Sequence, residues 1–128
     1  MATDAEQMEQ IAGQVQAALQ TADLTGYREL LDPNVTWGAP DDMEPSCRNR
    51  DQVLAWYRRG RAKGVRANVT ETLVHNDKIL VGLSIFDNQS SSDSDGQTHR
   101  WQILTVKSGL VVDIRGFEER AAAVSRME

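Results

Sequence analysis

Three ionisable residues near the C-terminal end of this sequence have the types and spacing that proton chemistry requires. The stretch VVDIRGFEER, residues 111–120, begins as an apolar strand and contains Asp113 and Arg115, with Glu118 shortly after. A carboxylate enclosed in a pocket can act as a general acid or base. The same residues can instead form a hydrated surface, where an exposed ion pair contributes only about 0–1 kcal/mol. The choice depends on which side of the strand is buried.

Side chains alternate along a strand, so this stretch has two faces. The uncharged face consists of Val112, Ile114 and Gly116. The charged face consists of Val111, Asp113, Arg115 and Phe117. Because an unpaired charge is costly to bury, we expect the uncharged face to line the interior, and Asp113 and Arg115 to lie outside as a solvated or dimer-contacting pair. Glu118 keeps the inner parity, either as the best catalytic candidate or as a carboxylate at the rim or at a helix start.

The register of the preceding hairpin decides where its polar side chains point. A three-residue loop at 107–109, with Gly109 in the left-handed conformation of a bulge, places Trp101 and His99 outside. The side chains that then face inward are Arg100, Gln102 and Leu104. A two-residue loop of Ser108 and Gly109 instead places Trp101 and His99 inside. We favour the three-residue loop, because Ser-Gly is a weaker two-residue turn sequence than Asn-Gly.

The length and charge of the chain restrict its class. A chain of 128 residues has the usual size of one domain, here expected to span 1–128. Nineteen acidic and 14 basic residues give a net charge of -5, which disfavours binding to nucleic acid. One basic cluster follows a predicted helix and is expected to be a solvated face. Its members are Arg58, Arg59, Arg61, Lys63 and Arg66.

The sequence contains little that indicates a disulfide, a membrane segment or a metal site. Cys47 is the single cysteine, and no histidine is marked as its catalytic partner. The N-terminus lacks a basic stretch and an apolar region, and no apolar run approaches the ~20 residues that cross a bilayer, so we expect a cytoplasmic protein with no membrane partner. His75 and His99 have no evident third ligand. A calcium-loop pattern between Ser91 and Gln102 fails at both ends, so no metal and no cofactor is expected.

The elements follow from caps and periodicity. Helices are predicted over 4–20 and over 24–31, the second capped by Asp23, and a third begins after its cap, Asn49. A few extended residues lie near Trp37. After Gly64, β-rich runs form two hairpins, with turns at 76–77 and near 108–109, and a short helix can follow at the end. The expected fold class is α+β, with three N-terminal helices on one face of a mostly antiparallel sheet.

The order of these elements resembles the nuclear transport factor 2-like superfamily, and within it the SnoaL-like proteins. The resemblance lies in LLDPNVTW at 30–37, CRNRDQVLAWYRRG at 47–60 and WQILTVKSGLVVDIRGFEER at 101–120. It implies a curved sheet around a cone-shaped internal pocket, and homodimers that meet through the outer sheet face. The superfamily includes polyketide cyclases, ketosteroid isomerases, epoxide hydrolases, dehydratases and non-catalytic carriers.

The acid/base positions implied by the resemblance are empty in this chain. The ketosteroid isomerase aspartate falls near Gly38 and Ala39, and the tyrosine that accompanies it falls close to Val15. The SnoaL-like aspartate of the last strand falls on Gly116. None of these residues can transfer a proton, so the resemblance implies the fold more clearly than a reaction.

The sequence therefore predicts a domain that binds a small apolar molecule in an apolar pocket. It is either an isomerase, cyclase or hydrolase of unassigned reaction, or a non-catalytic ligand-binding or dimeric structural protein, and whether it is an enzyme stays open. Remoter catalytic candidates beside Glu118 are Asp41, Asp42 and His99. The candidate ligand-contacting residues are Trp37, Tyr57, Arg100, Trp101, Gln102 and Ile114.

Overall fold

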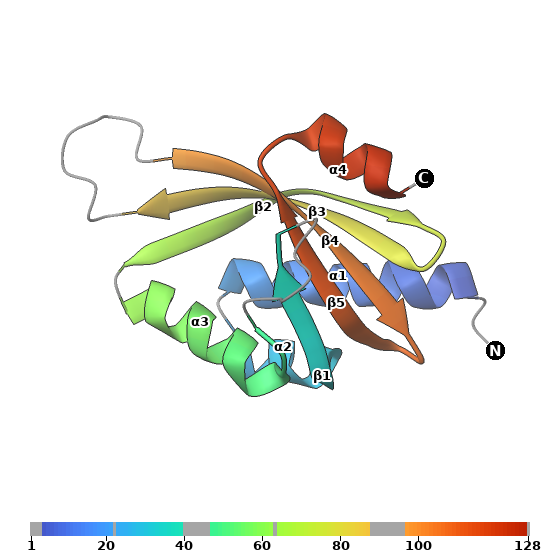
Figure 1. The fold of residues 1–128 in the computed structure, drawn as a ribbon, viewed down its shortest axis with the longest axis horizontal. Coiled ribbons are helices and arrows are strands. Elements are labelled where there is room, and N and C mark those ends of the chain that lie inside the picture. The colour runs from blue at the N-terminus through green and yellow to red at the C-terminus, as the bar shows by residue number, and fades with distance from the viewer. Residues whose placement is uncertain (1–3, 22, 40–46, 63, 88–96, 128) are drawn as a thin grey trace.

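A computed structural model describes residues 4–21, 23–39, 47–62, 64–87 and 97–127. It has an α+β architecture, with four helices and a five-stranded mixed sheet in the order β1-β5-β4-β3-β2 (Figure 1). The elements are α1 Asp4–Thr21, α2 Leu24–Leu30, β1 Leu31–Gly38, α3 Arg50–Ala62, β2 Val65–His75, β3 Lys78–Asp87, β4 Gln97–Lys107, β5 Leu110–Phe117 and α4 Arg120–Met127. The predicted fold class is confirmed.

The caps predicted from the sequence begin the second and third helices. The Asp23 carboxylate accepts a hydrogen bond from the Gly26 amide at the start of α2, at 3.0 Å. At α3, the Asn49 side chain accepts from the Gln52 amide at 2.9 Å, and the Gln52 side chain accepts from the Arg48 amide at 2.7 Å. These contacts satisfy amides that have no partner inside the helix. Helix α2 ends one residue earlier than predicted because Leu31 already belongs to β1.

Strand β1 is longer than the few extended residues predicted near Trp37. It has eight residues and runs parallel to β5, with Trp37 beside Ile114. Its register shifts between Leu31 and Thr36, so its burial does not alternate as in a regular strand. Pro33 is compatible with this strand because β1 lies at the sheet edge, where one side needs no ladder hydrogen bonds.

The two faces of the sheet are covered by different helices. Helices α1, α2 and α3 lie on one side, here called the inner face, and α4 lies on the opposite, outer face (Figure 1). The inner core contains one apolar stripe of α1, formed by Met8, Ile11, Val15 and Ala18. The outer cluster under α4 contains Leu80, Ile103, Phe117, Ala123 and Met127. Helix α4 thus occupies part of the face through which the resemblance implied homodimers.

The last hairpin differs from the favoured prediction. Lys107 pairs with Leu110, so the loop has two residues, and Ser108 and Gly109 have φ angles of 53° and 81°. Two consecutive positive φ angles are typical of a type I′ turn. The favoured three-residue loop is therefore wrong, although the turn is where the sequence placed it.

A β-bulge in β5 then changes which of its side chains face the inner core. Val106 pairs with Val111, but Thr105 pairs with Asp113, which leaves Val112 as the extra residue. Val111 is consequently buried in the inner core, and the prediction that Val112 faces inward and Val111 outward is wrong. Beyond the bulge the prediction is confirmed, since Ile114 lies in the inner core and Phe117 in the outer cluster.

The start of α4 is fixed to the outer face by Glu71. Its carboxylate accepts hydrogen bonds from Arg120 Nε at 2.7 Å and from Trp101 Nε1 at 3.2 Å. Gly82 makes room for this contact, because a Cβ there would lie 2.8 Å from the Glu71 side chain and 3.3 Å from Trp101 Nε1. One carboxylate thus joins β2, β4 and α4. No helix in the described part of the chain is both long and apolar enough to span a membrane.

We expect the contribution of Glu71 to stability to depend on pH. The hydrogen bond from Arg120, followed by that from Trp101, lowers the pKa of Glu71 against the opposing effect of burial. A group with a lowered pKa in the folded state stabilises it above its unfolded pKa, near about 4.3, and loses this effect as pH falls through the folded pKa. Glu71→Gln should therefore lower the free energy of unfolding at pH 7, by an amount that shrinks below about pH 4, in urea titrations at several pH values.

Glu9→Gln is the matched control for this titration, because Glu9 is an exposed carboxylate on α1. It should leave the free energy of unfolding close to that of the wild type at every pH. Equal pH profiles for Glu71→Gln and the wild type would contradict the role given to Glu71.

Candidate functional site

Three polar side chains from different elements meet inside the inner core. Tyr27 of α2 and Tyr57 of α3 pack edge to face, with ring centroids 5.5 Å apart. Gln102 of β4 donates a hydrogen bond from Nε2 to the Tyr57 hydroxyl at 3.4 Å. Tyr27 and Gln102 are 0% and 6% exposed. The sheet and two helices thus bring one polar cluster, Tyr27, Tyr57 and Gln102, into an apolar surrounding.

This polar cluster is only partly satisfied. The Tyr27 hydroxyl and Gln102 Oε1 are buried and have no hydrogen-bond partner among the described residues. The same is true of Trp37 Nε1 on the neighbouring part of the inner face. Most buried polar atoms in proteins are paired with protein or water, and each exception requires an explanation.

Both tyrosines in the cluster are hydrogen-bond donors at neutral pH. Burial, and secondly the neighbouring Tyr57, raises the pKa of Tyr27 well above its ordinary value. Burial also raises the pKa of Tyr57, partly offset by the hydrogen bond from Gln102. The two hydroxyls also influence one another, because the interaction between them raises the pKa of Tyr27 and lowers that of Tyr57. Neither hydroxyl therefore serves as a base in this state.

Open space lies on the inner face directly beside Gln102. Gly116 of β5 is the cross-strand partner of Gln102, so a Cβ at Gly116 would point to the same face. Among the described residues, no atom other than those of its chain neighbours lies within 4 Å of that position. Strand β1 pairs with β5 only as far as Gly38 and Arg115, so the end of β5 has no paired strand on that side in the described part of the chain. A hollow of about 370 Å³ lies at this end of β5, lined by Ala39, Gly116, Phe117, Glu118, Glu119 and Ala122. Its lining includes Phe117 and Ala122 of the outer side, and no member of the polar cluster.

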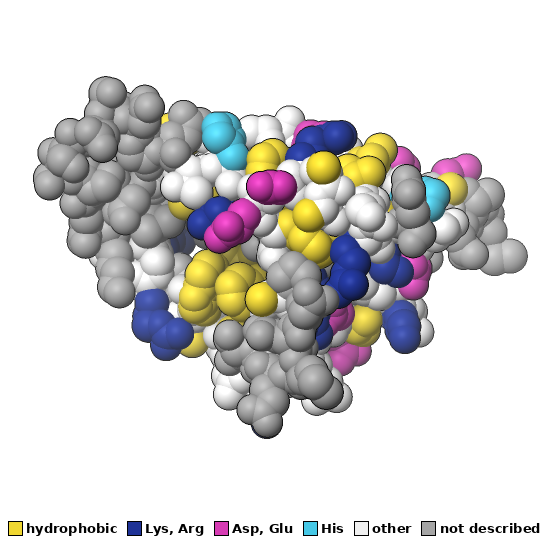
Figure 2. Space-filling model, turned by 45° about the horizontal axis from the view of Figure 1, so that its top comes forward, with side chains coloured by type: hydrophobic (Ala, Val, Ile, Leu, Met, Phe, Trp, Pro, Cys, Tyr) yellow, Lys and Arg dark blue, Asp and Glu magenta, His cyan; other side chains and the backbone are white. Residues whose placement is uncertain are grey.

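Two aromatic rings and one ion pair lie on β1, α3, β4 and the residue after β5. Trp37 is held in place by two backbone hydrogen bonds with Cys47, at 3.0 and 3.1 Å, and its ring lies 4.8 Å from that of Trp56. Arg100 and Glu118 form an ion pair at 3.8 Å, with the Glu118 side chain 81% exposed. Figure 2 shows that hydrophobic side chains reach the surface of this molecule beside acidic and basic ones. The surroundings combine flat apolar walls with a hydrated rim.

The structure brings most of the predicted ligand-contacting residues together. Trp37, Tyr57 and Ile114 belong to or pack against the inner core. Gln102 lies among them, and Arg100 lies at the rim. The predicted inward direction of Arg100 and Gln102 is thus consistent with their contacts.

Trp101 and His99 lie elsewhere. The Trp101 indole donates to Glu71 and packs against the outer cluster, so this candidate is on the face opposite the polar cluster. His99 is exposed, with its ring 6.5 Å from that of Trp101. Asp41, Asp42 and the calcium-like segment at 91–96 lie outside the described residues.

Tyr27 was missed by the sequence reasoning. It is the one buried residue of the seven-residue helix α2. A large aromatic on so short a capped helix must pack against another element, and that pattern could have identified it. Its partner could not be predicted, because the sequence does not say that α2 lies next to α3.

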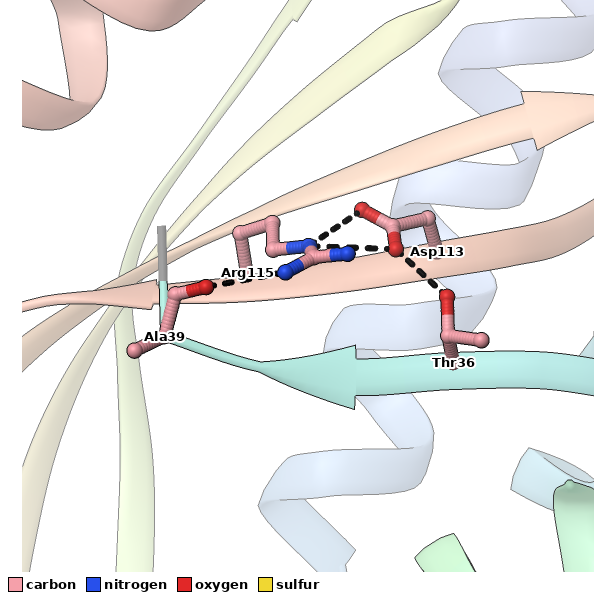
Figure 3. Close-up of polar contacts among 4 residues, drawn as sticks. All are labelled: Thr36, Ala39, Asp113 and Arg115. Carbon is pink, nitrogen blue, oxygen red and sulfur yellow. Dashed lines mark hydrogen bonds and ion pairs between the residues drawn. The ribbon is translucent and has the colours of Figure 1, made fainter. Parts of the chain in front are cut away.

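Asp113 and Arg115, the charged pair of β5, have a structural role on the outer face. Arg115 Nε donates to both carboxylate oxygens of Asp113 at 3.1 and 3.2 Å, and Arg115 Nη1 donates to the Ala39 carbonyl at 2.9 Å (Figure 3). The Thr36 hydroxyl donates to Asp113 at 2.5 Å. These contacts fasten the edge strand β1 and the residue after it to β5. The predicted position of Asp113 and Arg115 outside the inner core is confirmed.

The described residues contain few groups for acid/base or metal chemistry. Their buried polar or charged side chains are Ser84 and Gln102, so no described carboxylate is buried. Within the same residues, no three His, Cys, Asp or Glu side chains gather to hold a metal ion. Burial raises the pKa of the Cys47 thiol, partly offset by Arg59, which makes it a poor nucleophile.

Comparison with known proteins identifies the fold. Neither protein-family models nor curated protein sequences match this chain. Among solved structures, it is similar to Bal32a from a soil-derived mobile gene cassette, with 20% identity over 98% of each chain and a TM-score of 0.75. It is also similar to a candidate ketosteroid isomerase from Kribbella flavida DSM 17836, with 18% identity over 90% of this chain and 79% of that chain, and a TM-score of 0.72.

A third solved structure carries the family name that the sequence resembled. It is a nuclear transport factor 2-like protein of unknown function from Burkholderia pseudomallei K96243, with 19% identity over 93% of this chain and 95% of that chain, and a TM-score of 0.68. The prediction of this fold from the sequence is confirmed. At identities of 20% or less, these likenesses concern the fold and not a reaction.

The unpaired hydroxyl of Tyr27 leads to a stability prediction. Removing a buried polar atom that makes no hydrogen bond relieves its desolvation, so Tyr27→Phe should raise the free energy of unfolding by about 1 kcal/mol. Tyr57→Phe should lower it by about 1 kcal/mol, because Gln102 loses its partner. Urea denaturation of the two variants tests this opposite pair of effects. A destabilised Tyr27→Phe protein would show that the hydroxyl is already satisfied in the free protein.

Proposed function

We propose that this chain, a nuclear transport factor 2-like fold, binds a small and mainly apolar molecule on its inner face, in the space over Gly116. The observation that carries the proposal is that a Cβ at Gly116 would meet no described atom within 4 Å, at the end of β5 where a hollow of about 370 Å³ lies. Ligand sites of this kind are largely apolar, with a few convergent polar groups. The polar groups that line the hollow are Glu118 and Glu119.

The walls of the proposed site suit a flat ligand. Ile114 and Trp37 are neighbours on the inner face, and Trp37 packs at a tilt of 34° against Trp56, which is 42% exposed. Aromatic rings offer a large contact area to another flat molecule. The aromatic pair would cover one side of the ligand.

Binding without turnover is the form of the proposal that the side chains support. Glu118, the best catalytic candidate in the sequence, is largely exposed and pairs with Arg100. An effective acid or base is usually tuned by burial or by specific neighbours. The positions at which the resemblance implied an aspartate hold Gly38, Ala39 and Gly116, which carry no ionisable group. We therefore place a non-catalytic ligand-binding protein ahead of an isomerase, cyclase or hydrolase.

Filling the space over Gly116 should abolish binding. We expect members of a library of steroids, polyketides and terpenoids to raise the melting temperature of the wild type, and Gly116→Leu to remove that response because its side chain occupies the space. The control is Gly13→Leu, since Gly13 is exposed on α1 and a Cβ there also meets no atom within 4 Å. It should keep the response of the wild type. A wild type that responds to no compound would contradict the proposal.

Neutralising Glu118 should leave binding unchanged. Because its carboxylate lies at the hydrated rim, Glu118→Gln should alter the dissociation constant of any library compound less than about threefold between pH 5 and 8. Isothermal titration calorimetry measures this constant. A compound that wild type converts to a product, but that Glu118→Gln leaves intact, would restore Glu118 as a catalytic acid or base.

A further inference from the structure

We propose that a second hollow, on the outer face of the sheet, binds the phosphate group of a small organic phosphate. The hollow has a volume of about 300 Å³. Its described lining residues are Lys78, Ile103, Thr105, Asp113, Arg115, Phe117 and Arg126. Only Phe117 among them also lines the hollow by Gly116, so the inference goes beyond the proposed function.

The register of the sheet places the floor of this hollow on the outer face. Lys78 of β3 pairs with Thr105 of β4, and Thr105 pairs with Asp113 of β5. Next to this row, Ile103 pairs with Arg115, and Ile103 belongs to the outer cluster under α4. Cross-strand partners point to the same face of a sheet. A polar row and a partly apolar row therefore lie side by side on the floor.

The third basic side chain comes from the last turn of α4. Arg126 is exposed, while Ala123 and Met127 of the same helix are buried against the outer cluster. This packing holds the end of α4 beside the floor, so that Arg126 lines the same hollow as Lys78 and Arg115. Basic groups from β3, β5 and α4 thus surround one space.

These basic side chains are accessible to a ligand. The side chains of Lys78 and Arg115 are 33% and 23% exposed. A partly buried charge is screened less by salt than a fully exposed one. An anion that enters the hollow can therefore contact Lys78 and Arg115 and interact with them more strongly than with cations on the open surface.

The charges that line the hollow do not cancel. Three basic side chains face one lining carboxylate, Asp113, in a chain whose net charge is -5. Asp113 already accepts hydrogen bonds from Arg115 and from the Thr36 hydroxyl (Figure 3). Outside the lining, Asp77 pairs with Lys78 at 3.2 Å. With both carboxylates counted, these described groups still carry a net positive charge.

A phosphate monoester suits this set of groups. It carries nearly two negative charges at neutral pH and offers three strong acceptor oxygens. Guanidinium groups bind phosphate with paired hydrogen bonds, and an ammonium group binds it as a point charge. The Thr105 hydroxyl is a further donor. Ile103 and Phe117 provide apolar contact for the organic group, so the hollow should prefer an organic phosphate to inorganic phosphate.

Phenyl phosphate is the probe for this site, compared with inorganic phosphate, benzoate and phenol. Isothermal titration calorimetry of the whole chain at about pH 7.5 and low salt measures the dissociation constants, since a phosphate monoester is then largely dianionic. Phenyl phosphate should bind roughly fivefold more tightly than inorganic phosphate or benzoate, and phenol should bind more weakly still.

Two charge-removing variants assign the binding to the hollow. Lys78→Gln and Arg126→Gln should each weaken the binding of phenyl phosphate roughly fivefold or more. Arg58→Gln is the matched control, because Arg58 is an exposed residue of α3 that does not line the hollow, and it should bind as the wild type does. If Lys78→Gln fails to fold, Arg126→Gln still decides, because Arg126 is exposed.

Four outcomes would overturn the inference. A wild type that does not bind phenyl phosphate shows that the hollow is not a phosphate site. An equal loss of affinity in Arg58→Gln and Arg126→Gln shows that the anion responds to overall charge and not to this hollow. Benzoate as the tighter ligand shows a carboxylate site, and inorganic phosphate as tight as phenyl phosphate shows that the apolar floor is not used.

Discussion

The extra residue at Val112 is the constraint on which the arrangement of the inner core depends. A two-residue turn without a bulge would pair Leu104 with Asp113 and Gln102 with Arg115, and both charges would then point toward the helices. The bulge shifts the register, so that Ile114 and Gly116 take those places and Asp113 and Arg115 face outward. The same shift puts a glycine beside Gln102. One residue therefore keeps an ion pair out of the core and also pairs Gly116 with Gln102.

The sequence predicts the helices and strands well because local residues, such as helix caps and turn residues, determine where they begin and end. Asp23 and Asn49 cap the helices where the sequence placed them. The bulge has no such local signature, since Ser108-Gly109 is compatible with loops of two or three residues. The predicted three-residue loop gave the correct inward direction for Gln102, but the loop itself is wrong. In the structure, that direction results from a two-residue loop followed by the bulge.

The candidate site was harder to predict than the fold because it depends on contacts between distant segments. Tyr57 and Gln102 were identified as candidates, but their hydrogen bond joins α3 to β4 across 45 residues. Tyr27 was missed, and Trp101 was included although it lies on the outer face beside Glu71. An unpaired buried atom has no counterpart in sequence patterns, because whether a hydroxyl finds a partner is decided by packing within a few tenths of an ångström.

Gly116 stands where the resemblance implies a catalytic group, and it leaves open space there instead. The resemblance implies an acid/base aspartate at this position, and a side chain there would project into the space beside Gln102. A buried carboxylate would provide chemistry, but it would fill part of the volume and require a compensating partner. Glycine removes both the charge and the volume.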